Sequence, residues 1–361
     1  PTQFMAASER DVRRWLTEAD AVLAVAVFGD PARRLKDQLQ RHDQRGLRVM
    51  ALNGEQSLSL LSRTGAGRLQ GFPSDTLRDL TLESPPPAAL EKARSHAVAT
   101  EWLALRRTWQ AGGSHNIAHL FAHLSNPSAV LPAPTFEASL RLRLGNVELL
   151  DDAVWKGNAA LKPGPTLVVL DLANSDPGAA DALCAESRRR GQACAVLMAR
   201  WSEQSKKALK NLKEILAPAR PAALIVLQDF VVGAAEGREA ATAALTKLNV
   251  PVFKAIRLTD RSATQWRLSP DGLPADSVQY RVALPELQGA GQPIVIAAAG
   301  RPQSDVRTGI EIKRPEILAT EVSRLVARAV RWQRLAAKEN RDKRLAIVYY
   351  NHPPGRQNIG A

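Results

Sequence analysis

The sequence lacks the features that define several protein classes. No run of about 18 apolar residues occurs in its 361 residues, so we expect no transmembrane helix in this chain, and its start has no signal-peptide core. Of the two cysteines, Cys184 falls in a predicted helix and Cys194 in a predicted strand, with no CxxC or Cys/His zinc spacing. We predict two buried thiols and a cytoplasmic location.

Nucleotide-binding and common hydrolase motifs are also missing. The sequence has no P-loop, no GxGxxG, no GxSxG and no HExxH. The predicted strand-to-helix turn at residues 172–178, LANSDPG, lacks the glycines that cradle a phosphate. The sequence therefore predicts that ATP is not bound by this chain.

Positive charge is in excess. The formal net charge is +13 and the pI is near 10.2. The basic residues are spread over several predicted helices, without the aromatic-interleaved pattern of a nucleic-acid module. This distribution favours an anionic partner, such as a polycarboxylate macrocycle, or an acidic surface elsewhere in a longer protein, and we expect no nucleic acid partner.

Apolar runs alternate with amphipathic helices, which is typical of α/β folds. A first β-α-β unit spans residues 21–52, and four further buried strands are predicted at 165–172, 193–199, 222–228 and 250–258. The fold class is therefore α/β, with flavodoxin-like doubly wound parallel sheets and an inserted helical segment.

The same pattern divides the chain into four parts. They are an N-terminal α/β domain (1–85), a helical segment (86–135), a flavodoxin-like domain (136–300), and a long helix and strand leading into a further domain (301–361). Near the end, the patterns predict β-like pieces at 277–287 and 292–300, a long helix from Arg314 and a last strand at 343–351.

Three of the six histidines lie in one short segment, HNIAHLFAHL. His115, His119 and His123 follow each other at i, i+4 and i+8, so neighbouring pairs share one helix face and suit one metal ion or the edge of a macrocycle. The outer pair is about 12 Å apart along a helix, too far for all three to share one ion readily. The other interpretation is a half-buried polar stripe beside Ile117 and Leu120.

The last eleven residues, NHPPGRQNIGA, follow an apolar run. Two prolines stiffen this loop, and Gly355 and Gly360 allow close approach to a ligand. The side chains of Asn351, Arg356 and Asn358 offer hydrogen bonds to a carboxylate or phosphate. The alternative is a tight structural turn.

These segments together resemble the CobN and magnesium chelatase H-subunit family. The stretch LAIVYYNHPPGRQNIGA is similar to the family's strand and its N-Y-P-P-G-K-x-N-I-G-A motif, with His352, Arg356 and Gln357 as departures. Three further stretches resemble the family in the same order, TWQAGGSHNIAHLFAHLSNP (108–127), the block 165–199, and VPVFKAIRL (250–258) followed by DSVQYRVALPELQG (276–289).

The resemblance implies the N-terminal part of a large subunit that binds a tetrapyrrole, either a corrinoid, a porphyrin or haem, and exchanges its divalent metal, Co, Mg or Fe. In the biosynthetic members, AAA-type ATPase subunits use ATP to drive insertion. The family's proposed metal and substrate groups lie mainly beyond the terminal motif, so the resemblance leaves the catalytic residues of this chain unknown. We expect this stretch alone to be inactive. The full-length protein would be a cobaltochelatase-like ligase.

The histidines depart from the family pattern, because His115 stands where Glu is usual and His119 and His123 replace other residues. They suggest a divergent, haem-uptake-associated member that removes metal. A module that binds haem or a corrinoid without metal exchange is a further alternative.

Overall fold

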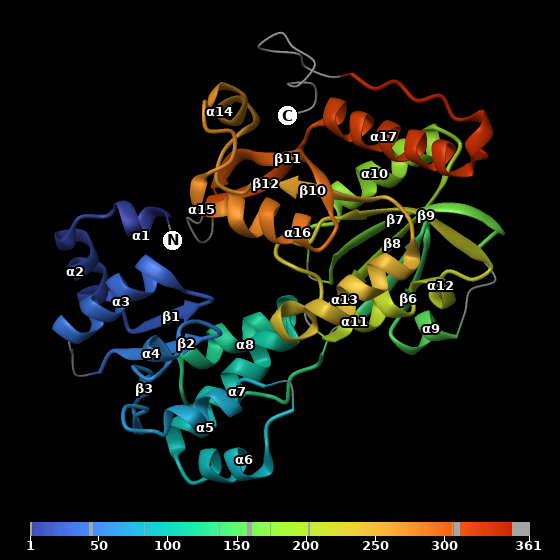
Figure 1. Cartoon of the computed structure of the whole chain (residues 1–361). Coiled ribbons are helices and arrows are strands. Elements are labelled where there is room, and N and C mark those ends of the chain that lie inside the picture. Colours follow the sequence, from blue (N-terminus) through green and yellow to red (C-terminus); the bar gives the residue numbers. More distant parts are fainter. Residues whose placement is uncertain are drawn as a thin grey trace, which may run out of the picture. The chain divides into compact units, whose positions relative to one another are not determined.

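The structure is a computed structural model. It describes residues 2–42, 46–82, 84–136, 138–156, 161–173, 175–200, 203–304, 306 and 311–348. The chain forms two compact units, residues 1–137 and 138–361 (Figure 1). The helical segment 86–135 packs within the first unit. None of the described helices is long and apolar enough to cross a membrane.

The first unit is built on a small sheet of order β1-β2-β3-β4, in which β1 and β2 are parallel. This confirms the predicted β-α-β unit. Its strands are β1 (Ala21–Val25), β2 (Arg48–Leu52), β3 (Arg63–Thr64) and β4 (Gly67–Arg68). Its helices are α1 (Thr2–Ala6), α2 (Glu9–Glu18), α3 (Gly29–Arg41), α4 (Gln56–Ser59), α5 (Ser74–Asp79), α6 (Pro87–Arg94), α7 (Ala97–Ala111) and α8 (Gly113–Ser125).

Two apolar clusters hold this unit together. One joins α2 and α3 to the sheet, and the other joins α7 and α8 to it. Trp102 belongs to the second cluster, where its ring is buried and its Nε1 donates a hydrogen bond of 2.7 Å to the Ala51 carbonyl. A buried indole needs such a partner, so this bond fixes α7 against β2.

The second unit contains an eight-stranded sheet of order β12-β11-β10-β9-β7-β8-β5-β6. The five strands β7 to β11 are parallel and, numbered along the chain, run 2-1-3-4-5, the flavodoxin-like order. The predicted fold class is confirmed. The strands are β5 (Leu140–Leu144), β6 (Val147–Leu150), β7 (Gly164–Leu172), β8 (Ala193–Ala199), β9 (Ala219–Val226), β10 (Val252–Arg257), β11 (Gly291–Ser304) and β12 (Glu311–Ile317).

Helices cover both faces of this sheet (Figure 1). One face carries α10 and α17, whose apolar side chains pack on the inner residues of β7 to β10, and the other carries α9 and α11 to α13. The bounds are α9 (Asp152–Trp155), α10 (Gly178–Arg189), α11 (Glu203–Lys210), α12 (Leu212–Ile215), α13 (Ala234–Leu248), α14 (Ala263–Leu268), α15 (Ala275–Val278), η1 (Gln279–Ala283), α16 (Leu284–Leu287), α17 (Ala319–Ala337) and η2 (Asn340–Asp342).

The predicted β-like piece at 277–287 is wrong, because these residues form α15, the π-helix η1 and α16. The apolar residues of SVQYRVAL alternate as in a strand. The buried positions are instead Ser277, Arg281, Pro285 and Gln288, which follow helical spacing. Most of these residues are polar, so a hydrophobicity pattern does not reveal the buried face.

The end of the chain differs from the prediction in two places. The long helix begins at Ala319, not at Arg314, because residues 311–317 form the edge strand β12, antiparallel to β11. Val322, Leu325 and Val326 form the buried apolar face of this helix. The predicted last strand is wrong over residues 343–348, which have no strand, and its remaining residues lie outside the described ones.

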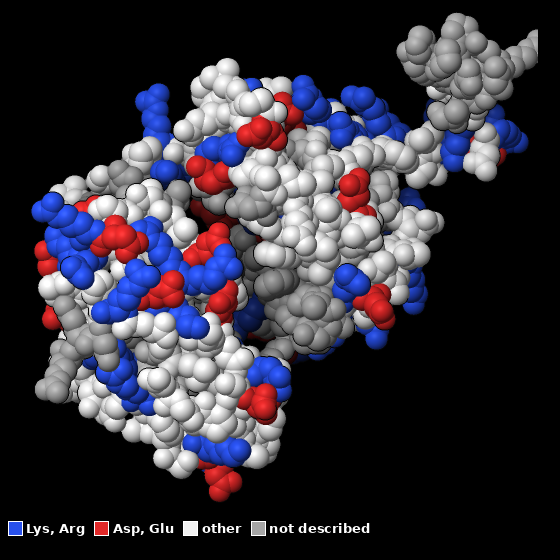
Figure 2. Space-filling view, turned by 60° about the vertical axis from the view of Figure 1, so that its left-hand side comes forward, with Lys and Arg blue, Asp and Glu red and all other residues white. Residues whose placement is uncertain are grey.

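Charged side chains are mixed on the surface. On the face shown in Figure 2, lysine and arginine lie among aspartate and glutamate. The positive excess is therefore spread over this face, in agreement with the dispersed basic residues of the sequence.

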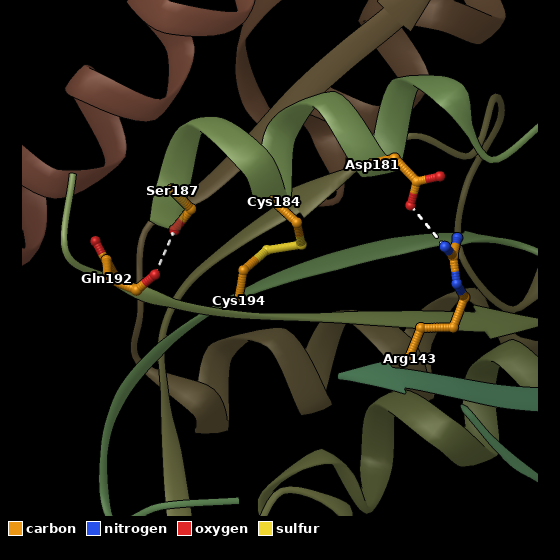
Figure 3. The surroundings of a disulfide bond; sticks show 6 residues. All are labelled: Arg143, Asp181, Cys184, Ser187, Gln192 and Cys194. Atoms are coloured by element: carbon orange, nitrogen blue, oxygen red, sulfur yellow. Dashed lines mark hydrogen bonds and ion pairs between the residues drawn. A yellow bond between two sulfur atoms is a disulfide. The ribbon is translucent and has the colours of Figure 1, made fainter. Parts of the chain in front are cut away.

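The two cysteines do not remain thiols, which corrects the prediction. Cys184 on α10 and Cys194 on β8 form a disulfide with a Cα–Cα distance of 5.3 Å, inside the apolar layer between helix and sheet (Figure 3). In the last turn of α10, the Ser187 hydroxyl donates to the carbonyl of Gln192, which follows the helix, at 3.2 Å. Cys184 and Cys194 meet because β8 packs against α10, the helix that precedes it. The spacing of the two cysteines along the chain does not reveal this packing.

We expect this disulfide to stabilise the second unit. It closes a loop with a sequence separation of 10, for which the loss of chain entropy in the unfolded state corresponds to about 3 kcal/mol. Urea unfolding with and without reductant should therefore show a lower free energy of unfolding for the reduced protein. The Cys184→Ser/Cys194→Ser variant should resemble the reduced protein and ignore reductant. An unfolding midpoint that reductant leaves unchanged would contradict the assignment.

Candidate functional site

The predicted substrate residues of the terminal motif are Asn351, Gly355, Arg356, Asn358 and Gly360, and all of them lie outside the described residues. Their roles stay predictions. The described residues include the histidine helix α8 and the carboxyl edge of the eight-stranded sheet.

The histidine helix α8 is anchored at its start. Gly112 has φ +70°, which ends α7 and allows the chain to turn into α8. The buried Asn116 side chain then donates to the carbonyls of Gly112 and Thr135, both at 2.6 Å, and accepts from the Thr135 N–H. Leu120 and Leu124 bury the inner face. The fixed helix therefore sets which way its histidines point.

His115 and His119 meet on the outer side of this helix. Their Nε2 atoms are 3.0 Å apart, and their rings lie edge to face with centroids separated by 4.4 Å. A hydrogen bond between them needs one Nε2 to donate and the other to accept. Two bonds of about 2.0–2.1 Å from one metal ion, at tetrahedral or octahedral angles, span about 3 Å between nitrogens. The pair therefore matches the bite of a transition metal ion.

His123 is engaged elsewhere. Its Nδ1 lies 2.9 Å from the Ala129 carbonyl, and its Nε2 lies 3.3 Å from Oε1 of Glu101 on α7. Across the described ranges, no group of three or more His, Cys, Asp or Glu side chains is placed to hold a metal ion. The structure thus brings together two of the three predicted histidines, and metal binding by them stays a prediction.

A polar cluster, not expected from the sequence, lies where the parallel strands end. In an open α/β sheet, ligands bind beyond the carboxyl ends of the strands where the strand order reverses, here between β7 and β9. Asp171 at the end of β7 is fully buried and accepts two hydrogen bonds from Arg257 at the end of β10, of 2.7 and 2.8 Å. Arg257 also donates to the Ser175 hydroxyl, at 3.1 Å. This bidentate ion pair spans the switch point.

Lys254, three residues before Arg257 on β10, is completely buried. Its Nζ donates to the carbonyls of Gln228 and Ala255, at 2.8 and 2.9 Å, and lies 3.3 Å from Oδ1 of Asp229. Burial lowers the pKa of Lys254 to about 8, against the opposing attraction of Asp229. The Lys254 ammonium group therefore loses its proton at a lower pH than an exposed lysine does.

Gln228 completes the cluster. It is fully buried, and its Nε2 donates to the Asp171 carbonyl at 3.3 Å. Its Oε1 has no hydrogen-bond partner among the described residues. Each strand of the cluster thus carries a polar residue near its end within an apolar run. That exception to the apolar pattern is the sequence signal that could have identified the cluster.

The comparisons with known proteins agree with this architecture. The model of the family CobN/Magnesium Chelatase matches residues 106–361, so the chain belongs to this family. The chain is 41% identical over 120 residues to the chloroplastic magnesium-chelatase subunit ChlH of Oryza sativa subsp. indica, covering 33% of this chain and 8% of that protein. It is 28% identical over 143 residues to the aerobic cobaltochelatase subunit CobN of Sinorhizobium sp, covering 40% and 11%.

A solved structure shares the fold. The catalytic subunit of cobaltochelatase from Mycobacterium tuberculosis aligns with 96% of this chain at a TM-score of 0.50 and 17% sequence identity. The aligned part is 26% of that protein. The chain thus spans a small part of the length of the relatives it matches.

Lys254 provides a test of the buried cluster through pH. Folded Lys254 loses its proton near pH 8, whereas the unfolded residue keeps it to about 10.5, so raising the pH across this window favours the folded state. The contribution is about 3 kcal/mol. Wild type should therefore gain this free energy of unfolding relative to Lys254→Met between pH 8 and 10.5, measured by urea unfolding. Parallel pH profiles for the two proteins would refute the lowered pKa.

Proposed function

We propose that this chain is the N-terminal part of a tetrapyrrole metal chelatase large subunit, which inserts cobalt into a corrinoid or performs a related metal exchange on a porphyrin. The family match over residues 106–361 carries this proposal, since it includes the histidine helix, the second unit and the terminal motif. The matched stretches cover only a small share of the length of the relatives. We therefore propose that the complete activity belongs to a longer protein.

The proposed reaction needs an energy source outside this chain. The sequence has no P-loop, and we propose that AAA-type ATPase subunits bind and hydrolyse ATP as partners. The tetrapyrrole and the divalent metal, Co, Mg or Fe, are the substrates.

The terminal motif is proposed to hold the macrocycle by its polar edge. Arg356 would form charge-assisted hydrogen bonds with a carboxylate substituent, while the amides of Asn351 and Asn358 would add neutral ones. Gly355 and Gly360 would let the backbone approach the ring.

This role predicts a carboxylate-specific loss of affinity in Arg356→Ala. A hydrogen bond to a charged group contributes about 1.5–3 kcal/mol, so the affinity for protoporphyrin IX should fall roughly 10- to 150-fold. Protoporphyrin IX dimethyl ester lacks the carboxylates and should bind both proteins alike, as followed by tryptophan quenching. An equal loss for both ligands would argue against carboxylate recognition, and wild type that binds neither would count against the proposed function itself.

The histidine pair favours a second candidate, a haem-uptake-associated protein of the dechelatase type or a haem-binding module without metal exchange. Both imidazoles come from one helix face, so they cannot flank a haem iron from opposite sides. They suit either one axial contact or a metal ion outside the ring. His123, with both nitrogens engaged, would serve this site only indirectly, by holding the helix.

The histidine proposal predicts weaker metal binding in His115→Ala/His119→Ala. Calorimetry with Co²⁺ should show more than a roughly tenfold loss of affinity, the cost of losing even an outer partner of a metal site. The Soret band of added haemin should also shift less than with wild type. His42→Ala, a histidine at the end of α3, is the matched control. Equal binding by wild type and the double variant would make the histidine stripe structural.

The cytoplasm is the proposed location, because the partner ATPases would find ATP there. The disulfide weighs against it, since disulfides are rare where glutathione keeps thiols reduced. Thiol labelling of Cys184 and Cys194 in freshly lysed cells tests the location. Labelled free thiols would favour the cytoplasm, and an intact disulfide would favour an oxidising compartment.

A further inference from the structure

Phe230 has an unusual backbone at the switch point. It follows β9 and the buried Gln228, and its φ is +62°, in the left-handed region that bulky residues rarely adopt. Of the described non-glycine residues with positive φ, Phe230 is the one aromatic residue. Such outliers persist where the surrounding structure holds them, and they cluster at ligand sites.

Neighbouring groups hold the Phe230 ring in place. It stacks on Tyr280, with centroids 4.8 Å apart and planes inclined by 20°, and the Phe230 N–H donates to the Tyr280 carbonyl at 2.8 Å. Tyr280 belongs to the π-helix η1, a type of turn frequent at functional sites. The Arg281 guanidinium lies 5.3 Å from the Tyr280 ring centre, and Arg281 is itself bound to Asp229.

The Phe230 ring remains 42% exposed despite this support. A purely structural residue at this position would be glycine, which adopts the left-handed region freely, or would bury its ring. The protein instead keeps part of an aromatic ring exposed at the edge of the sheet where ligands of this fold bind. A bulky aromatic residue on a backbone conformation that favours glycine indicates a functional position.

We propose that the Phe230 ring, backed by Tyr280, forms a stacking platform for a planar conjugated macrocycle, a subsite that rests on the proposed tetrapyrrole function. The aromatic faces supply stacking that needs no charge on the ring. A flavin or other nucleotide fits less well. The start of α10, where its phosphate would bind, is occupied by the Asp176 carboxylate, which accepts from the Gly178 N–H at 2.9 Å.

Phe230→Gly tests the platform. Glycine removes the ring and adopts the same backbone without strain, so the melting temperature should not fall. The affinity of the 361-residue chain for metal-free protoporphyrin IX, measured by porphyrin fluorescence, should fall roughly 5- to 150-fold, the range for loss of one aromatic stacking partner. Phe230→Tyr should bind like wild type. Phe28→Gly, which removes a 58% exposed ring from the first unit, is the matched control and should leave binding unchanged.

The outcomes separate the platform from the proposed function. If wild type and Phe230→Gly bind protoporphyrin IX alike, the platform is wrong and the proposed function stands. If wild type binds no tetrapyrrole, both fail. Binding of flavin mononucleotide in place of protoporphyrin, sensitive to Phe230→Gly, would overturn the choice of ligand. Should Phe230→Gly lower the melting temperature, Phe230→Leu decides, since it keeps the bulk and loses the aromatic face.

Discussion

The bidentate ion pair between Asp171 and Arg257, together with the buried Lys254, fastens the strand ends of the second unit. Taking these charges out of water is costly, and the cost is offset only because each group has a close partner in fixed geometry. Removing one partner would leave a buried charge uncompensated. The cluster therefore requires β7, β9 and β10 to end in register at the switch point.

The positions of the neighbouring elements follow from this requirement. Asp229 contacts both Lys254 and Arg281, so the buried cluster continues into the π-helix η1. That contact sets Tyr280 beside Phe230, where an open ring is held on a strained backbone. A buried hydrogen-bonded cluster that continues into the residues around a partly exposed aromatic ring is the arrangement that a binding site needs, because supporting contacts hold the exposed group in place.

Much of the fold could be predicted from local patterns. Buried parallel strands are continuous apolar runs, so β7 to β10 are evident in the sequence, as are the helices between them. The prediction failed where burial involves polar residues. Arg281 and Gln288 face inward in η1 and after α16, and no hydrophobicity period marks them. The prediction also failed at β12. There the chain pairs with β11 as a strand, and the helix begins only after Leu318.

By itself, the sequence determined the family, most of the alternation of strands and helices, and the buried face of the amphipathic helices, because these depend on residues near one another in the chain. Only the tertiary structure decided which distant side chains meet. It paired Cys184 with Cys194, separated His123 from the other two histidines, and assembled the buried cluster from three strands. Such contacts depend on register and packing between elements, which the spacing of residues along a chain does not contain.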